Sequence, residues 1–509
     1  MSDPALTWNP ALGLCRQEAP GHTAPVADLP AVHNGVVTAT HLCVLAQKGL
    51  LDEAQALAAL RSFRAMQQGP GTERAGCLRW YWEESQPVDT NASFFIGLCL
   101  QLLYLAEGTK LTEPVRAAIR EIVEGLAVWF EHELIAAHPR YPNKCMGDLV
   151  CGWLAAGVLG RSPSEKLQQT TREWCDYWAE SHWGWGEHMS DIYTMVLLTE
   201  LSAVLLFCPD LPPDIRARFK RHFDELLRIE DSYRRGPRVP VIRSYAFTES
   251  PPVMPFRGFI CDAFTESDSG GGRHPAIAVR IQAAVFGVWF QRAGWNVLAP
   301  AEEVLPEWVE TSCREGAVAR ALVRNNLRIG AMSHYPIMAG VDHPTWGLSW
   351  QTFPAALWRP QGDWAFWRWT TREGDRVRAH PALDKHSAYL GNALSAQVDP
   401  PPLPRMTSTL SPAGHLVMER ELPLPGAVRW DEVEDAFCLL ESDAVVRAEK
   451  NALELRWPDA VVRVRWLGDA PISWEPAARG GRWVVRYSAE QLTGRAELTH
   501  RWELQVGYC

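Results

Sequence analysis

The sequence lacks the features that mark several large classes of protein. It has no block rich in lysine and arginine, and its formal net charge is -10, so it shows no electrostatic footprint for nucleic acid. Its longest apolar run, 195–207, is interrupted by polar residues and is too short to cross a bilayer. Its first residues contain neither the basic region nor the apolar region of a secretory signal. We therefore expect a cytoplasmic protein that binds neither nucleic acid nor a membrane.

Motifs that hold metals and cofactors are missing as well. The 12 cysteines are scattered singly, without a C-x-x-C pair or a Cys/His cluster at zinc spacing. This distribution is typical of reduced, buried thiols. No phosphate-binding glycine loop, nucleophile elbow or H-E-x-x-H helix occurs in a context that would support its function. The sequence therefore predicts no cofactor and no catalytic metal.

The composition, 47% hydrophobic and 22% charged, is that of a folded protein, and 509 residues are too many for one ordinary core. The first two thirds of the chain show helical periodicity. The helical segments form pairs with short links: 31–49 with 51–66, 93–106 with 113–134, 146–159 with 164–180, and 190–207 with 213–230. Short links make neighbouring helices antiparallel, so we predict an (α/α) toroid of helical hairpins.

The helical pattern stops after these hairpins. Residues 231–275 are rich in proline and glycine and predict a long structured loop, a length that is usually functional. Helices are expected again at 276–293 and 306–323. Residues 325–398 are dense in tryptophan, but glycine, proline and charges interrupt every period. We expect loops there, with a few last helices or strands.

A proline-rich run at 398–405 marks the clearest boundary in the chain. After it, short segments alternate between apolar and polar residues and are separated by turn signals. This spacing predicts a small antiparallel β-sandwich. The predicted organisation is a mainly α protein, with a catalytic (α/α) toroid over 1–397 and a C-terminal β-sandwich over 405–509.

One stretch, 183–193, combines aromatic faces with ionisable groups at the start of a predicted helix. Trp183 and Trp185 flank a glycine, and Glu187, His188 and Tyr193 follow within a few residues. Such a mixture suits a carbohydrate, because sugars stack on flat rings and acid/base groups act on their bonds. The alternative is structural, with the tryptophans in the core and His188 near a helix cap. We interpret the stretch as part of an active site.

The order of elements, a ring of α-hairpins followed by a β-sandwich, resembles the (α/α)-toroid polysaccharide lyases of the heparinase II/III-like and chondroitin-lyase-like groups. The resemblance implies that Asn91, in Asp-Thr-Asn-Ala-Ser, neutralises the carboxylate of a uronate. It implies that His188 and Tyr193 act as base and acid. The glycine-rich loop 268–274 is similar to a loop of these lyases that is followed by a histidine, which makes His274 a further catalytic candidate.

A lyase of this kind removes a proton next to a carboxylate, which requires donors that stabilise the developing negative charge and a base that takes the proton. The implied partner is an acidic oligosaccharide or polysaccharide. Further candidates for substrate binding are Arg243, Tyr245, Arg273, His334, Tyr335, His343 and Trp346. Each has a bland alternative as a turn, cap or packing residue.

Other functions stay open at this point. An inverting glycoside hydrolase on the same toroid needs a pair of carboxylates with room for water between them. Acids for such a pair are available at Glu83, Glu84, Asp89, Glu187, Asp191 and Asp268. A sugar epimerase would also use a helical ring, and a non-catalytic sugar-binding protein would account for the tryptophans alone. The sequence does not indicate the oligomeric state.

Overall fold

The computed structural model describes residues 6–136, 139–184, 186–233, 237–242, 275–295, 307–334, 352–360, 362–381, 405–424 and 430–507. The chain divides into two compact units. The helical unit comprises Met1–Gly184, Ile192–Arg228 and Met254–Glu302. The sheet unit comprises Trp185–Asp191, Ile229–Val253 and Glu303–Cys509.

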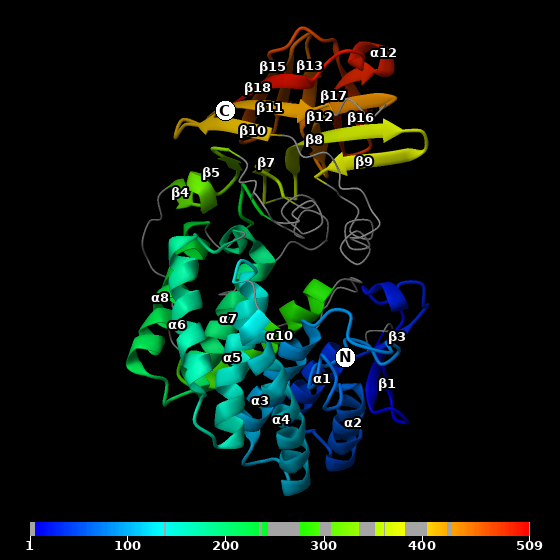
Figure 1. Cartoon of the computed structure of the whole chain (residues 1–509). Helices are drawn as coiled ribbons and strands as arrows, with labels where there is room; N and C mark the ends of the chain where they lie inside the picture. Colours follow the sequence, from blue (N-terminus) through cyan, green and yellow to red (C-terminus); the bar gives the residue numbers. More distant parts are fainter. Residues whose placement is uncertain are drawn as a thin grey trace. The chain divides into compact units, whose positions relative to one another are not determined.

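The predicted hairpin segments are confirmed as helices (Figure 1). Their bounds are α1 (Gly35–Gln47), α2 (Glu53–Met66), α3 (Ala92–Glu107), α4 (Glu113–Ala136), α5 (Pro142–Leu159), α6 (Glu165–Glu180), α7 (Asp191–Phe207), α8 (Pro213–Ser232) and α10 (Pro275–Arg292). Side chains cap several starts, as where Asn34 accepts from the backbone of Val37 at 3.1 Å and Ser164 from that of Leu167 at 3.1 Å.

The helices form two rows. In the first row α1 packs against α3, α3 against α5, and α10 against α1 and α3. In the second row α2 packs against α4, and α4 against α6. Helix α3 is buried over most of its length, whereas α6 alternates buried and exposed positions. Because α4 returns antiparallel between them, α3 and α5 run in parallel. Closure of the rows into a toroid stays a prediction.

A small sheet precedes the first helix and was not predicted. Its antiparallel strands are β1 (Leu6–Asn9), β2 (Leu14–Gln17) and β3 (Val32–Asn34), in the order β1-β2-β3. The strands are only three or four residues long, too short for a visible period-two pattern. Among the described helices of the chain, none has both the length and the apolar character needed to cross a membrane.

The sheet unit contains two large antiparallel sheets (Figure 1). One has the order β16-β17-β12-β8-β7-β6-β5-β4, with β9 beside β8, and the other has the order β10-β11-β18-β15-β14-β13. The strands are β4 (Trp308–Ser312), β5 (Val318–Val323), β6 (Arg328–Met332), β7 (Ala355–Trp358), β8 (Trp364–Glu373), β9 (Arg376–His380), β10 (Arg405–Leu410), β11 (His415–Pro423), β12 (Glu432–Leu440), β13 (Val445–Ala448), β14 (Ala452–Arg456), β15 (Val461–Trp466), β16 (Ile472–Ala477), β17 (Gly480–Ser488) and β18 (Glu497–Gly507).

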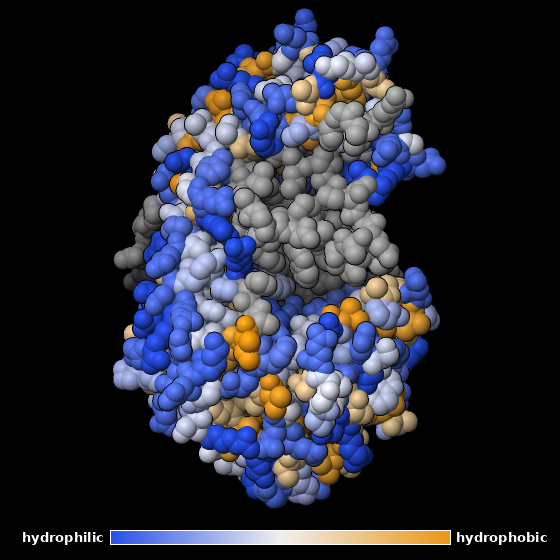
Figure 2. Space-filling model, viewed as in Figure 1, coloured by the Kyte–Doolittle hydropathy of each residue, from blue (hydrophilic) through white to orange (hydrophobic). Residues whose placement is uncertain are grey.

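Aromatic side chains from both sheets fill the space between them. Trp502 of β18 meets Trp367 of β8 at 6.4 Å and Trp483 of β17 at 5.7 Å between ring centroids. Both contacts are edge-to-face, an arrangement that aromatic rings favour. The predicted packing of antiparallel sheets is therefore present at the C-terminal end. On the face seen in Figure 2, apolar residues are scattered among hydrophilic ones.

A charged group lies inside this sandwich. Asp435 of β12 is fully buried and accepts hydrogen bonds from Arg420 of β11 and from two groups of β18, His500 Nδ1 at 2.8 Å and Trp502 Nε1 at 3.0 Å. The far nitrogen of His500 lies 2.9 Å from the Tyr487 hydroxyl. Asp435 thereby ties the two sheets together through polar contacts.

Two expectations need correction. The helix predicted at 306–323 is wrong: this range forms β4 and β5, joined by a turn in which Glu315 and Gly316 have φ of 57° and 73°. The domain boundary predicted at 398–405 does not coincide with the observed division either. Strands β4–β9, which lie before it, share one sheet with β12, β16 and β17, which lie after it. The helical unit therefore does not extend through residue 397.

Candidate active site

Asn91 and Tyr141 occupy equivalent places, each immediately before a helix of the first row. Asn91 precedes α3, and Tyr141 precedes α5, whose first residue is Pro142. Because α3 and α5 pack in parallel, their starts lie together, and Asn91 Nδ2 donates a hydrogen bond to the Tyr141 hydroxyl at 3.3 Å. Both residues are partly exposed.

The backbone also favours negative charge at this place. The N-terminus of a helix carries a partial positive charge and N–H groups without intrahelical partners. Asn91 and Tyr141 each lie at such an N-terminus, and neither side chain caps its own helix. The amide and the hydroxyl are thus directed to each other. At α3 the backbone N–H groups of Asn91, Ala92 and Ser93 already donate to Asp89 and Thr90.

A chain of hydrogen bonds through Asp89, His22 and Tyr81 holds the backbone of Asn91 in place. Asp89 accepts from the Asn91 backbone N–H at 3.0 Å and lies 3.0 Å from His22 Nε2. His22 Nδ1 lies 2.7 Å from the Tyr81 hydroxyl, which also accepts from the His22 backbone N–H at 3.3 Å. The Tyr81 proton therefore points to Nδ1, and the imidazole proton on Nε2 points to Asp89. His22 in this way holds the loop that carries Asn91.

Glu84 fixes a neighbouring part of the same region. Its carboxylate is 1% exposed and accepts from the Thr23 hydroxyl at 2.5 Å and from the backbone N–H groups of Trp80 and Tyr81 at 2.9 and 3.0 Å. Burial raises the pKa of Glu84, although the hydrogen bonds act in the opposite direction. Because these contacts are internal, we interpret Glu84 as a residue that positions Tyr81.

His188 and Glu187 lie in a short 3-10 helix, η2 (Glu187–Met189), which belongs to the sheet unit. Both residues are 1% exposed. His188 Nε2 lies 2.9 Å from the carbonyl oxygen of Ser312, and a carbonyl only accepts, so Nε2 carries the proton. Cys313 Sγ lies 3.9 Å from the same nitrogen. This hydrogen bond anchors η2 to strand β4, and a role of His188 as a base stays a prediction.

Trp183 belongs to the core of the helical unit. Its ring is fully buried, stacks on Trp178 at 6.2 Å with an angle of 8°, and meets His222 edge-on at 4.7 Å. Its indole nitrogen donates to Glu225 at 3.3 Å. A sugar platform needs an accessible aromatic face. The structure therefore supports the packing role of Trp183 and gives no support to a platform role.

The other predicted residues are dispersed over both units. Tyr193 is partly exposed in the first turn of α7, in the helical unit. His334 is partly exposed after β6, in the sheet unit, with Nδ1 at 3.3 Å from the Ser333 hydroxyl. The remaining candidates lie outside the described residues: Trp185, Arg243, Tyr245, Arg273, His274, Tyr335, His343 and Trp346.

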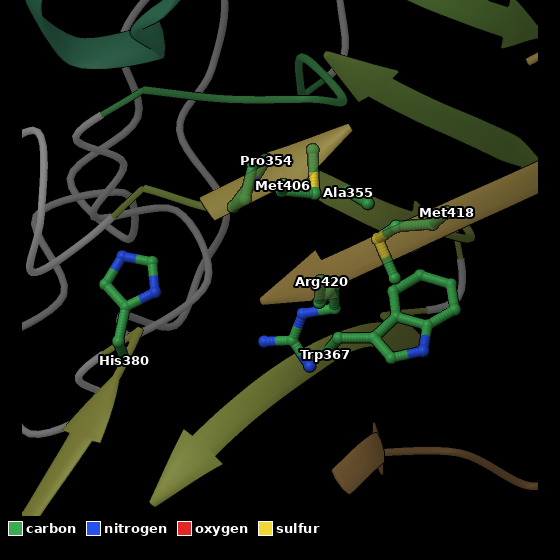
Figure 3. A pocket seen from close by; sticks show the side chains of 7 residues that line it. All are labelled: Pro354, Ala355, Trp367, His380, Met406, Met418 and Arg420. Carbon is green, nitrogen blue, oxygen red and sulfur yellow. The ribbon is translucent and has the colours of Figure 1, made fainter. Parts of the chain in front are cut away.

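A cavity of about 10 Å³ lies inside the sheet unit (Figure 3). It has room for about one water molecule and none for a sugar ring. The lining residues are Pro354, Ala355, Trp367, His380, Met406, Met418 and Arg420. Within the described ranges, no group of three or more His, Cys, Asp and Glu side chains could hold a metal ion. That catalysis needs no metal stays a prediction.

Comparison with known proteins gives limited results. No family model matches the chain, and no curated protein matches its sequence. Two solved structures of heparan sulfate lyase HepC from Pedobacter heparinus, one of them a mutant, are similar in structure. The mutant has a TM-score of 0.43 and 9% identity, and the other has 0.41 and 10%. In both cases the match covers 93% of this chain and 76% of the other chain.

Sequence reasoning missed Tyr141, His22 and Tyr81. Tyr141 was missed because the helix after it was predicted to begin at Met146, whereas α5 begins at Pro142. A proline is a common first residue of a helix, so Pro142 was the signal that could have placed Tyr141 at a helix start. No local pattern marks His22, because its partners lie 59 and 67 residues away in sequence.

Proposed function

We propose that the protein is a polysaccharide lyase that cleaves a uronate-containing glycan by β-elimination. The observation that carries the proposal is the hydrogen bond between the Asn91 amide and the Tyr141 hydroxyl, at the starts of two parallel helices. It supplies a neutral donor and a titratable hydroxyl within reach of one ligand group. The implied substrate is an acidic oligosaccharide or polysaccharide.

In this proposal Asn91 binds the carboxylate of the uronate. Its Nδ2 hydrogens stabilise the negative charge that develops when the neighbouring carbon loses its proton. The carbanion electrons then form a double bond as the glycosidic carbon–oxygen bond breaks. The leaving oxygen takes up a proton, and no water is added. Elimination of this kind needs one group that accepts a proton and one that donates it.

Tyr141 lies within hydrogen-bond distance of Asn91 and can exchange a proton with a sugar bound there. As a phenolate it accepts the proton from carbon, and as a phenol it protonates the leaving oxygen. His188 and Tyr193 stay in the proposal as further proton-exchange groups, as the resemblance implies. The hydrogen bonds from His22 to Asp89 and from Asn91 to Asp89 hold the donor in place.

Product masses test the reaction type. The protein is incubated with glycans that contain glucuronate, galacturonate or no uronate, and the products are weighed by mass spectrometry. Elimination gives products whose masses sum to that of the substrate. Products heavier by one water would instead establish the alternative, an inverting hydrolase that uses paired carboxylates. Conversion of a sugar without cleavage would indicate an epimerase.

Substitution tests the site. Asn91→Ala and Tyr141→Phe should each lower kcat by about a hundredfold or more, since one removes an oxyanion donor and the other an acid/base group. The double variant should lose less than the product of the single losses, because both groups serve one transition state. The control is Tyr104→Phe, which removes a partly buried hydroxyl that binds Arg120 at 3.0 Å, elsewhere in the helical unit. Near-normal turnover of both single variants on the preferred glycan would refute the assignment.

His188→Ala and Tyr193→Phe are measured in the same assay. A large loss of turnover with an unchanged melting temperature would give that residue a part in proton transfer. Loss of stability with normal turnover of the folded fraction would give it a structural role, which for His188 would agree with its bond to the backbone of Ser312.

A further inference from the structure

The sheet unit contains a partly buried arginine, Arg368, whose guanidinium has no ion-pair or hydrogen-bond partner among the described residues. Arg368 lies in the middle of β8, directly opposite Ala436 of β12. Side chains alternate between the faces of a strand, so Arg368 shares a face with Phe366 and Thr370, whereas Trp367 and Trp369 point into the core between the sheets. We call this side of the nine-stranded sheet the Arg368 face.

The acids nearest to Arg368 along the sheet are engaged elsewhere. Glu434 of β12 binds Arg486 Nε at 2.6 Å and Arg482 at 3.1 Å. Glu475 of β16 binds Arg482 at 2.7 Å and also binds Arg486. Two carboxylates and two guanidiniums thus form a closed, neutral group on this face.

The next acid along β12, Asp435, points into the sandwich core and binds Arg420. Within the part of the chain that the structure describes, Arg368 has neither an ion-pair partner nor a hydrogen-bond partner, and its Nε is shielded from solvent. Burial lowers the pKa of Arg368. A guanidinium nevertheless stays charged at neutral pH. The sheet therefore holds one cation in excess at this place.

An uncompensated cation in a sheet costs stability, and replacing it with an apolar side chain would avoid that cost. The residue as a whole is only partly buried, although its Nε is shielded from solvent. The planar fork of N–H donors matches a pair of oxygens on a carboxylate or a sulfate. Thr370 supplies a hydroxyl two positions along the same face.

We propose that Arg368 is the centre of an oxyanion-binding site on the Arg368 face, which takes the carboxylate or sulfate group of a soluble ligand. The proposed site belongs to the sheet unit, whereas Asn91 and Tyr141 belong to the helical unit. The inference goes beyond the proposed lyase activity, and binding can be measured without turnover.

Calorimetric titration tests the site. The full chain and the Arg368→Met variant are titrated with sodium sulfate, with sodium glucuronate and with glucose, at constant ionic strength so that general screening is equal. The wild-type protein should bind at least one of the two anions saturably. Glucose, which has no charge, should not bind. The anion that binds identifies the group as a sulfate, a carboxylate or both. Arg368→Met should weaken binding by about tenfold to a hundredfold, the effect of a lost charge-assisted hydrogen bond.

Two further variants sharpen the test. Arg372→Met is the matched control, since Arg372 lies on the same strand and face but is 52% exposed and faces Glu432 at 3.6 Å; its affinity should change by less than about twofold. Arg368→Lys keeps the charge and loses the planar fork, so it should bind with an intermediate affinity. This variant separates the contribution of the charge from that of the planar fork.

Thermal stability without added anion provides a second readout. If Arg368 is kept for a ligand, Arg368→Met should melt at the same temperature as the wild type or higher, because an unpaired cation is removed. Added sulfate or glucuronate should then raise the melting temperature of the wild type only. Absence of saturable binding, equal affinity of Arg368→Met, or a lower melting temperature of this variant without anion would each overturn the proposal.

Discussion

Removal of the Asp435 carboxylate should destabilise the sheet unit more than any surface substitution nearby. Asp435→Ala leaves Arg420, which is 3% exposed, as a buried cation without compensation. Breaking a buried ion pair from one side costs about 3–5 kcal/mol. The donors of His500 and Trp502 also lose their acceptor, and each unsatisfied buried group costs about 1–3 kcal/mol. Because His500 can change tautomer, only the Trp502 donor stays unsatisfied, and we expect a total of about 4–8 kcal/mol.

Equilibrium unfolding in urea, followed by tryptophan fluorescence, measures this loss. The matched control is Glu432→Ala on the same strand, where the lost partner Arg372 lies at 3.6 Å and both side chains are substantially exposed. We expect that control to cost less than about 1 kcal/mol. A combined Asp435→Leu and Arg420→Met variant should recover part of the loss, because no unpaired charge remains. A cost below about 1 kcal/mol for Asp435→Ala would refute the reasoning.

The same carboxylate should give an acid limit to stability. Burial alone would raise the pKa of Asp435, but the charge of Arg420 and the hydrogen bonds from His500 and Trp502 outweigh it and hold the pKa below its usual range. A depressed folded pKa means that the stabilisation is complete above the unfolded value of about 3.9 and is lost as the pH falls through the folded value. Asp435→Asn should therefore flatten the dependence of unfolding free energy on pH in this acid range.

Three other predictions concern single residues. His22→Ala should lower kcat by about tenfold to a hundredfold through displacement of Asn91, with little change in melting temperature; unchanged kinetics would contradict this role. Burial, with the charges of Arg420 and Arg368, lowers the pKa of His380 to about 3, so the unfolded chain takes up its proton at a higher pH than the folded chain. Unfolding free energy should be constant above about pH 6.5 and fall by about 2 kcal/mol between pH 6.5 and 5, and His380→Leu should remove this slope in urea titrations. Gly330→Ala places a Cβ 1.9 Å from the carbonyl oxygen of residue 239, so it should cost about 3 kcal/mol in the same titrations, and an unchanged midpoint would contradict the close approach.

Helices were predictable because each carries its own pattern. Residues 213–230, for example, alternate charged and apolar positions with a helical period, and α8 extends over Pro213–Ser232. Residues 306–323 misled the prediction because two short strands with a turn have the length of one helix. Their buried positions alternate with a period of two, as Val309 and Thr311 show in β4, but the runs are only five and six residues long.

The division of the chain was harder to predict than its elements. No short stretch of sequence indicates that β8 pairs with β12, because paired residues such as Trp367 and Phe437 are far apart in the chain. The proline-rich run at 398–405 is a change of composition and not a change of unit. Sheet membership depends on pairings between distant strands, which no window of a single sequence contains.

The candidate site shows the same limit. Asn91 was found through the residues around it, whereas Tyr141 became visible only when the starts of α3 and α5 were placed side by side. Of the cluster predicted at 183–193, Trp183 packs in the core of the helical unit and His188 bonds to a backbone carbonyl of the sheet unit. Crowded polar residues in a sequence therefore do not have to share one site.

The place of β18 in the six-stranded sheet has a consequence for synthesis of the protein. This strand, Glu497–Gly507, comes last among the described strands, yet it lies in the interior of its sheet, between β11 and β15. The ribosome must release residue 507 before β11 and β15 can both pair with β18. The helical unit, built from sequential hairpins, can begin to fold much earlier. Until translation reaches β18, Trp367 of β8 and Trp483 of β17 lack the Trp502 ring that packs against them, so a nascent chain arrested shortly before β18 should bind chaperones.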